Sequence, residues 1–146
     1  MSLPYENTTS GDKAFADIQK ILGRFGCDNY GIMHKVGEQI TLIQFEWRGR
    51  TVQVPGHWGG YATQWLKEHP HTPRMRSTKA EHQAKAMEIA KVAVCSILRD
   101  WVKAQVTMVE CQMMTLEEVF MPHMLLPDGR RLVEHAQKLL GKVGDA

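Results

Sequence analysis

The sequence lacks the features that assign a chain to several large protein classes. No apolar run approaches the ~18 residues that a membrane span needs, and Met1 to Glu6 does not read as a signal peptide. Only three cysteines occur, without paired spacing, which is typical of reduced thiols in the cytoplasm. The net charge of +2 does not by itself indicate nucleic acid or lipid. We therefore expect a cytoplasmic protein that does not bind membranes.

Motifs of catalysis and of metal or cofactor binding are missing as well. There is no Gly-x-Ser-x-Gly, no phosphate-cradling glycine loop and no His-Glu-x-x-His. His69, His71 and His82 offer three imidazoles, but no fourth ligand is evident and no short paired spacing typical of zinc sites occurs. We therefore expect no enzymatic activity, no cofactor and no metal.

One acidic cluster could in principle hold Mg²⁺ or perform acid–base chemistry. It consists of Glu117, Glu118 and Asp128, with His123 nearby. Each acid also has a local structural role, since Glu118 fits a capping box, Glu117 a helix N-terminus and Asp128 a turn. We therefore expect these acids to have structural roles. Asp128 is the residue that we least expect to be free.

The length of 146 residues and the ordinary composition indicate a single domain over residues 1–146, with residues 1–9 disordered. Helical spacing predicts a helix over residues 12–25, capped by Ser10 or Asp12 and ended by Gly26. Alternating residues predict strands over 30–34, 39–47 and 51–54. A tight turn at 48–50 joins the last two, and Pro55 ends the third. These strands form a three-stranded antiparallel meander.

Residues 56–77 are irregular, with one or two helical turns in 61–68, and a long helix then starts at Ser77 or Thr78. It runs to about Met113 without Gly or Pro and is roughly 50 Å long, so it either bends or packs its overhang on another chain. We therefore expect a homodimer built partly on this helix. Its apolar seam comprises Met87, Ala90, Val94, Ile97, Trp101, Ala104, Met108 and Cys111.

Two short helices should complete the chain. Thr115 and Glu118 form a second capping-box pair, which predicts a short helix closed by Pro122. After the turn at 127–129, a last helix carries Leu132, Ala136, Leu139 and Leu140 before Gly141. The predicted fold class is α+β: an N-terminal helix, a three-stranded antiparallel meander, a long helix packing on the sheet and short C-terminal helices.

Several segments in this order resemble a family of small, uncharacterised bacteriophage and prophage proteins. They are the Arg-Gly-Arg hairpin at 48–50, Arg-Asp-Trp-Val-Lys-Ala at 99–104, Thr-x-x-Glu-x-Phe at 115–120, His123, and Leu-Pro-Asp-Gly-Arg at 126–130. The similarity covers most of residues 12–140 and departs in 56–76. It implies a phage origin and a cytoplasmic setting, with no agreed activity. Small phage proteins commonly manage nucleic acid, modulate a host protein or assist assembly.

The segment from His57 to Lys85 combines cations with aromatic residues, as proteins that bind single-stranded nucleic acid do. With the hairpin arginines, the predicted nucleic-acid site comprises Arg48, Arg50, Trp58, Trp65, Arg74, Arg76 and Lys79. The alternative is that Trp58 and Trp65 anchor a loop to the core while the charges are solvated. Our leading hypothesis is a non-enzymatic phage-type accessory protein that contacts single-stranded nucleic acid through this surface.

Methionine is concentrated near the C-terminus. The predicted interaction surface comprises Met108, Met113, Met114, Met121 and Met124. Methionine fills gaps in cores and is also frequent at adaptable binding surfaces. The adjacent Met113 and Met114 cannot both face one core. The alternative hypothesis is therefore a protein-interaction module, or a modulator of a host factor, that binds a host or phage protein through this surface.

Overall fold

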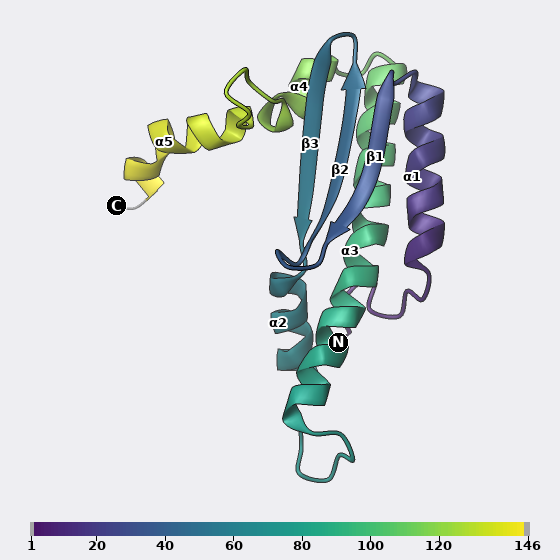
Figure 1. Cartoon of the computed structure of the whole chain (residues 1–146), viewed down its shortest axis with the longest axis vertical. Helices are drawn as coiled ribbons and strands as arrows, with labels where there is room; N and C mark the ends of the chain where they lie inside the picture. Colours follow the sequence, from purple (N-terminus) through teal and green to yellow (C-terminus); the bar gives the residue numbers. More distant parts are fainter. Residues whose placement is uncertain (1, 145–146) are drawn as a thin grey trace.

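The computed structural model describes residues 2–144, and the side chains up to residue 141. The elements are α1 (Gly11–Phe25), β1 (Asn29–Lys35), β2 (Ile40–Trp47), β3 (Arg50–His57), α2 (Gly59–Glu68), α3 (Lys79–Glu110), α4 (Leu116–Phe120), the 3₁₀ turn η1 (Met121–His123) and α5 (Leu132–Gly144). Figure 1 shows an N-terminal helix, an antiparallel sheet, a long helix and short C-terminal helices. The predicted α+β fold class is confirmed.

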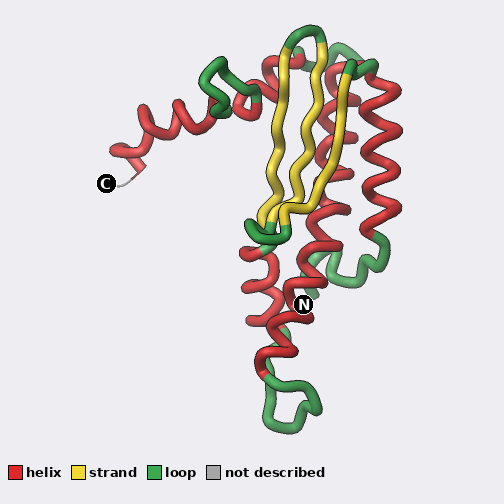
Figure 2. The backbone as a smooth tube through the Cα atoms, in the orientation of Figure 1, coloured by secondary structure: helices red, strands yellow, loops and turns green. Residues whose placement is uncertain are grey.

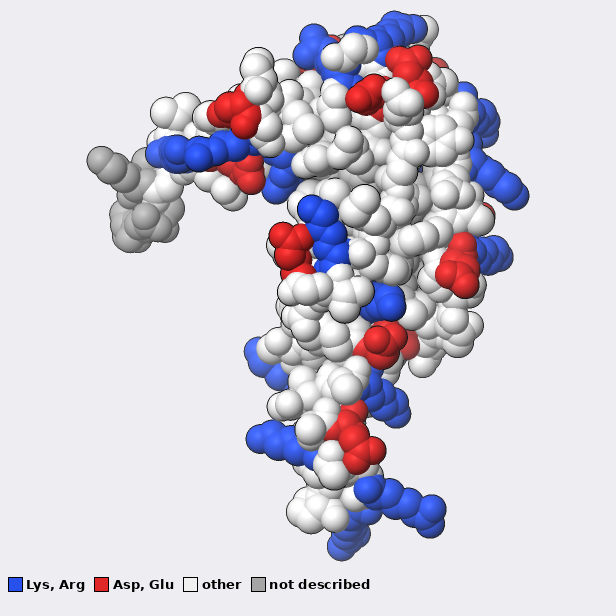
Figure 3. Space-filling model, viewed as in Figure 1, with Lys and Arg blue, Asp and Glu red and all other residues white. Residues whose placement is uncertain are grey.

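The sheet has helices on one face only. Its strand order is β1-β2-β3, and both pairs are antiparallel. The helices α1 and α3 lie side by side behind it, and no element within residues 2–144 lies over the opposite face (Figures 1 and 2). We call this uncovered side the outer face. Its middle shows neither Lys or Arg nor Asp or Glu (Figure 3).

The third strand is longer than its sequence predicts. Arg48 and Gly49 both have positive φ, 49° and 80°, as the two-residue hairpin between β2 and β3 requires. The prediction that Pro55 ends this strand is wrong, because β3 continues to His57 and Pro55 pairs with Leu42. Proline is tolerated there because β3 is an edge strand, where a missing N–H removes no sheet hydrogen bond.

The predicted helix caps are present. The Ser10 hydroxyl accepts a hydrogen bond from the Lys13 N–H, and Gly26 ends α1 with φ of 89°. Thr78 and Glu81 form a reciprocal capping box at the start of α3. These local bonds satisfy backbone groups that a helix end otherwise leaves without partners.

The long helix α3 differs from the prediction in its end and in its seam. It ends at Glu110 rather than Met113, and Gln112 has a positive φ of 56°. The predicted seam members Ala104 and Cys111 are exposed. One row of buried side chains, beside which Ala93, Cys95 and Ser96 are also buried, recurs every fourth residue instead: Ala86, Ala90, Val94, Leu98, Val102 and Val106. The heptad assumption fails because α3 packs on α1, α2 and the sheet, not on one parallel helix.

The overhang of α3 is covered within the same chain. Below the sheet, the first part of α3 lies against α2 (Figure 1), where Ala62 and Trp65 join Ala86 in the core cluster. The helices α1 and α2 thus both pack along the 32 residues of α3. The length of α3 is therefore no argument for a second chain. The prediction that 56–77 is irregular is wrong over Gly59–Glu68, where α2 forms.

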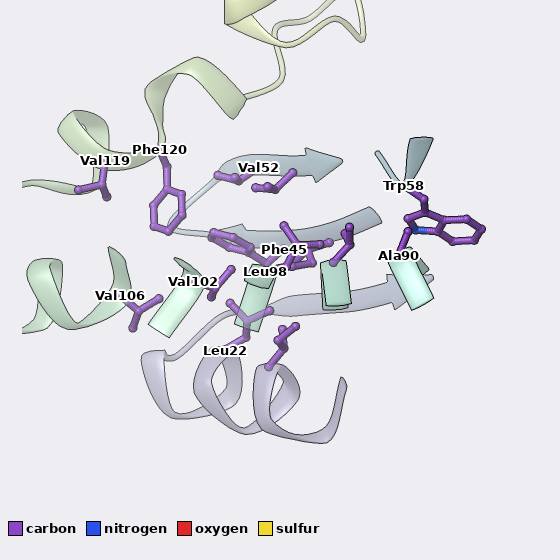
Figure 4. Packing of buried hydrophobic residues seen from close by; sticks show 14 of the residues in the cluster. Leu22, Phe45, Val52, Trp58, Ala90, Leu98, Val102, Val106, Val119 and Phe120 are labelled. Carbon is purple, nitrogen blue, oxygen red and sulfur yellow. The ribbon is translucent and has the colours of Figure 1, made fainter. Parts of the chain in front are cut away.

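The core lies between the helices and the inner face of the sheet (Figure 4). Phe45 of β2 meets Phe120 of α4 edge to face, with ring centroids 5.3 Å apart, so α4 closes one end. Trp58 and Trp65 close the other end. The fully buried side chains between them include Ile18, Leu22, Ile43, Val52, Val102 and Val106.

Residues 2–9 form turns without helix or strand, as their lack of periodicity predicts. We expected this segment to be disordered, but side chains hold it to the body. The Tyr5 hydroxyl donates to Asp100 (2.7 Å), and the Tyr61 hydroxyl donates to the Pro4 carbonyl (2.6 Å). For residue 1 the expectation lies outside the described residues.

Candidate interaction surface

The cations of the predicted nucleic-acid site fall into two separate groups. Arg48 and Arg50 lie at the turn between β2 and β3, at one end of the molecule (Figures 1 and 3). Arg74, Arg76 and Lys79 lie at the other end, where the loop enters α3. The 32 residues of α3 run between these ends, a length of about 48 Å at 1.5 Å per residue. The five cations therefore do not form one site.

The two tryptophans of that site belong to the core. Trp58 is 3% exposed and Trp65 5% exposed. The Trp58 Nε1–H donates to the Thr41 hydroxyl at 2.9 Å, and the Trp65 ring stacks on His69 with centroids 4.4 Å apart. Neither ring can stack on a base in this conformation. The prediction that they contact nucleic acid is therefore wrong, and the alternative, that they anchor a loop to the core, is correct.

The hairpin arginines already have partners within the chain. The Arg48 guanidinium lies 4.2 Å from the centre of the Trp47 ring, and Arg50 forms an ion pair with Glu117 at 3.4 Å. At the opposite end, residues 72–76 are all exposed. Among the ion pairs of the described residues, none involves Arg74, Arg76 or Lys79. We call residues 69–78 the tip loop.

The predicted methionine surface divides into core and surface members. Met124 is buried and Met108 is half-buried, whereas Met113, Met114 and Met121 are exposed. Met113 and Met114 become exposed because the chain leaves α3 there, and both their N–H groups donate to the Met108 carbonyl. Only three of the five methionines can therefore meet a partner directly.

A groove of about 470 Å³, lined on one side by Arg50 and Thr51, lies beside the exposed Met121. The Leu125 N–H donates to the Thr51 carbonyl at 2.8 Å, and the Leu132 N–H donates to the Met124 carbonyl at 2.9 Å. These bonds join the segment after η1 to the edge of β3 and bring it to the start of α5. Apolar side chains line much of the groove: Met121, Met124, Leu125, Leu126 and Leu132.

Helix α5 extends this apolar surface away from the body (Figure 1). Leu139 is 84% exposed and Leu140 66% exposed, on the same helical stripe as the half-buried Leu132 and Ala136. Within residues 2–141, no side chain or element covers this stripe. We call the groove and the stripe, at Met121, Leu125, Leu126, Leu132, Ala136, Leu139 and Leu140, the C-terminal arm.

Polar contacts fix the start of α5. Asp128 accepts a hydrogen bond from the Arg130 N–H at 2.9 Å and lies 3.0 Å from His135 Nε2. The backbone bond, together with His135, lowers the pKa of the Asp128 carboxyl. Glu134 accepts from the Arg131 N–H. Asp128 thus serves the turn, as its sequence position predicted, and Glu118 caps α4.

The outer face of the sheet is a second uncovered apolar surface. Register places Met33, Leu42 and Pro55 in one row across the three strands, where Met33 is exposed, Pro55 is half-buried and Leu42 is buried between them. Gly31 lies in the next row, and a hollow of about 280 Å³ opens over Gly31 and Leu42. In the same row as Gly31, the Gln53 amide donates to Gln44 at 2.6 Å. The middle of this face is therefore apolar or neutral.

Three side chains that could take part in covalent or acid–base chemistry, Cys27, Cys95 and His123, are partly or fully buried. Burial raises the pKa of the Cys27 thiol to about 11 and also raises that of Cys95, so both stay protonated near neutral pH. Burial and the nearby Arg131 lower the pKa of His123. Among the described residues, no three His, Cys, Asp or Glu side chains are grouped to hold a metal ion.

Comparisons with protein-family models, with curated proteins and with solved structures found no match to this chain. None of the helices within residues 2–144 combines the length and the apolar character that crossing a bilayer demands.

Sequence reasoning missed the exposure of Leu139 and Leu140. The period of Leu132, Ala136, Leu139 and Leu140 predicts a helix with one apolar face, but not that the face lacks a cover. For the outer face of the sheet a signal was present in the predicted order of elements. A meander of three strands has two faces, and the predicted long helix covers only one of them.

Proposed function

We propose that this protein is a non-enzymatic binding module that contacts another polypeptide through the C-terminal arm. The observation that carries the proposal is the exposure of Leu139 and Leu140 on a helix that projects from the body. Isolated exposed leucines are common, but a contiguous apolar patch on a soluble domain marks an interaction site. Here the groove and the stripe are continuous through Leu132.

The energetics agree with such a role. Burying a leucine side chain stabilises an assembly by about 1.5–3 kcal/mol, and neither Leu139 nor Leu140 gains this within its own chain. An amphipathic helix that presents apolar residues at helical spacing is a common means of protein recognition. Met121 at the mouth of the groove adds a flexible side chain that adapts to a partner.

The wider setting is also part of the proposal. The resemblance to small phage proteins supports a phage-type accessory protein that modulates a host factor or takes part in an assembly. The three free cysteines, of which Cys111 is exposed, support a reducing cytoplasmic location. The homodimer expected from the sequence is one form that such binding can take.

Site-specific photo-crosslinking tests the proposal. A benzophenone amino acid is placed at Leu139 in the full chain, and at Gln137, an exposed polar position of the same helix, as the matched control. We expect a covalent protein adduct from position 139 and little from position 137. Equal yields at both positions, or no adduct at position 139, would contradict it. So would Leu139-dependent sedimentation with anionic phospholipid vesicles, which would assign the arm to lipid.

A second candidate function is favoured by the tip loop. Arg74, Arg76 and Lys79 are exposed at the end of the molecule, and the sequence has no acidic residue from His69 to Ala80. This is a small electrostatic site for single-stranded nucleic acid that works without the buried tryptophans. Fluorescence anisotropy with a labelled oligonucleotide should show binding at 50 mM salt that weakens at 200 mM. Arg74→Ala with Arg76→Ala should reduce it and Arg48→Ala should not; no binding at 50 mM salt would rule it out.

A further inference from the structure

We infer that the polypeptide bound by the C-terminal arm is a second copy of this chain, with α5 of each copy lying on the outer face of the other copy's sheet. The inference rests on the proposed function and names the partner of the same surface. It joins two apolar surfaces that no described element covers: the stripe at Leu139 and Leu140, and the part of the sheet at the exposed Met33 and the hollow beside it.

The outer face has the properties of a helix-docking surface. Met33 is 53% exposed, and the hollow over Gly31 gives room for a side chain from above. A Cβ atom added at Gly31 would meet no atom within 4 Å, so the hollow is open space. The charged residues Lys35 and Glu46 lie at opposite ends of the face, in the first and last rows. A helix laid along this face therefore has apolar or neutral side chains beneath its middle and one charged side chain near each end.

The two surfaces match in size. Two strands of eight residues and one of seven, about 4.8 Å apart, form a face about 26 Å long and, with their side chains, wide enough for one helix. Helix α5 has 13 residues, so it is about 20 Å long and about 10 Å wide. One α5 therefore covers most of the outer face without reaching beyond it.

A reciprocal exchange also satisfies the requirements of a stable dimer. Helix α5 points away from its own sheet (Figure 1), so in this conformation its stripe can be covered only by another molecule. If α5 of each copy lies on the sheet of the other, the arrangement is closed by a two-fold axis. Taken as a cylinder about 20 Å long and 10 Å wide, α5 loses about 400 Å² of surface accessible to a 1.4 Å probe when half of it is covered. The sheet loses a similar area, so each contact removes about 800 Å² of accessible surface. Two contacts reach the roughly 1,600 Å² of a standard specific interface, which a single α5–α5 pair does not.

The mass in solution gives the first test. Sedimentation equilibrium of the full chain should give twice 16.6 kDa. Leu139→Glu on the helix and Met33→Glu on the sheet should each raise the dissociation constant at least tenfold, while Gln137→Glu should leave it unchanged. Leu139 and Met33 are exposed, so circular dichroism should show that both variants stay folded. If the wild-type chain is monomeric at 100 µM, a concentration about as high as the dissociation constants of specific complexes reach, the inference is overturned. A dimer insensitive to Met33→Glu would also overturn it.

Disulfide trapping gives the second test and separates the alternatives. In a Cys111→Ser background, which removes the exposed thiol, a chain carrying Met33→Cys is mixed with a chain carrying Leu139→Cys. Oxidation should link the two different chains. A prevalent link between two copies of the Leu139→Cys chain would indicate α5–α5 pairing instead. A monomeric intrachain link in a chain carrying both changes would show that the arm folds back on its own sheet, and either result would overturn the inference.

Failure of this inference and failure of the proposed function give different results. If the chain is monomeric but the photo-crosslinker at Leu139 still captures a different protein, the binding module stands and the second copy is wrong. If the photo-crosslinker at position 139 captures neither a second copy nor a different protein, both this inference and the proposed function are wrong.

Discussion

Replacing Gly56 with alanine should destabilise this protein, because α3 approaches β3 most closely at this residue. A Cβ atom at position 56 would lie 2.7 Å from Val94 Cγ1 and 2.8 Å from Leu98 Cδ1. Ordinary carbon contacts lie at about 3.5–4.0 Å. The sequence had placed Gly56 in a flexible turn after Pro55, where an alanine would be harmless, so the substitution also tests the position of the strand.

The expected magnitude follows from the two contacts. Val94 sits on a helix, where a β-branched side chain has one strongly preferred rotamer, so it cannot turn away. Relief therefore requires α3 and β3 to separate locally, and overpacking of this kind costs about 1–3 kcal/mol. With about 2.1 cal/mol/K of unfolding entropy per residue, 146 residues give about 0.3 kcal/mol/K. A loss of about 2 kcal/mol then lowers Tm by about 7 °C.

Urea unfolding followed by tryptophan fluorescence measures this loss, and thermal unfolding by circular dichroism checks it. The matched control is Gly37→Ala, which adds the same methyl group to a glycine in the turn between β1 and β2, whose surroundings are open. The control should be neutral or slightly stabilising, because alanine reduces the entropy of the unfolded chain.

A compensating change makes the cause specific. Leu98→Ala removes one of the clashing side chains, so Gly56→Ala should cost less in that background than in the wild type. If Gly56→Ala unfolds at the same urea concentration as the wild type, the close contact between β3 and α3 is wrong. If Gly56→Ala lowers the free energy of unfolding by the same amount in the Leu98→Ala background as in the wild type, the strain does not come from the contact with Leu98.

Two further predictions concern the cap of α3 and the half-buried His123. Thr78→Ala removes the cap of α3 and should cost about 1 kcal/mol in urea unfolding, whereas Thr72→Ala in the same loop should cost little; equal values would contradict the capping role. Burial and Arg131 lower the pKa of folded His123, so its contribution to stability is complete above the unfolded pKa of about 6.5 and is lost as the pH falls below it. The free energy of unfolding should thus fall from pH 7.5 to pH 5.5, less steeply in His123→Gln, and an unchanged slope in that variant would refute this.

The sequence predicted most of the secondary structure because the signals were local. Ser10, Gly26 and the capping box at Thr78 set helix ends through bonds within a few residues, and Arg48 and Gly49 supply the positive φ of the hairpin. Errors arose where distant elements decide. Pro55 is compatible with β3 only because that strand lies at an edge, which depends on the order of strands.

The candidate site was less predictable for the same reason. Trp58 and Trp65 look like binding residues beside cations in the sequence, but the fold buries both against α3. Met113 and Met114 were predicted to be unable to share one core, and the chain reversal after α3 exposes both. Whether an apolar residue is covered depends on elements far away in sequence, and periodicity cannot report it.

By itself the sequence determined the order of elements, their caps and the antiparallel meander, since these follow from side-chain period and from hydrogen bonds over short spans of the chain. Only the tertiary structure decided where surfaces remain open. It placed the hairpin arginines and the tip loop at opposite ends of α3, covered the overhang of α3 with α2, and left the outer face and the C-terminal arm without partners. Burial is a property of packing between distant segments, and that packing identifies the surfaces available to a second copy.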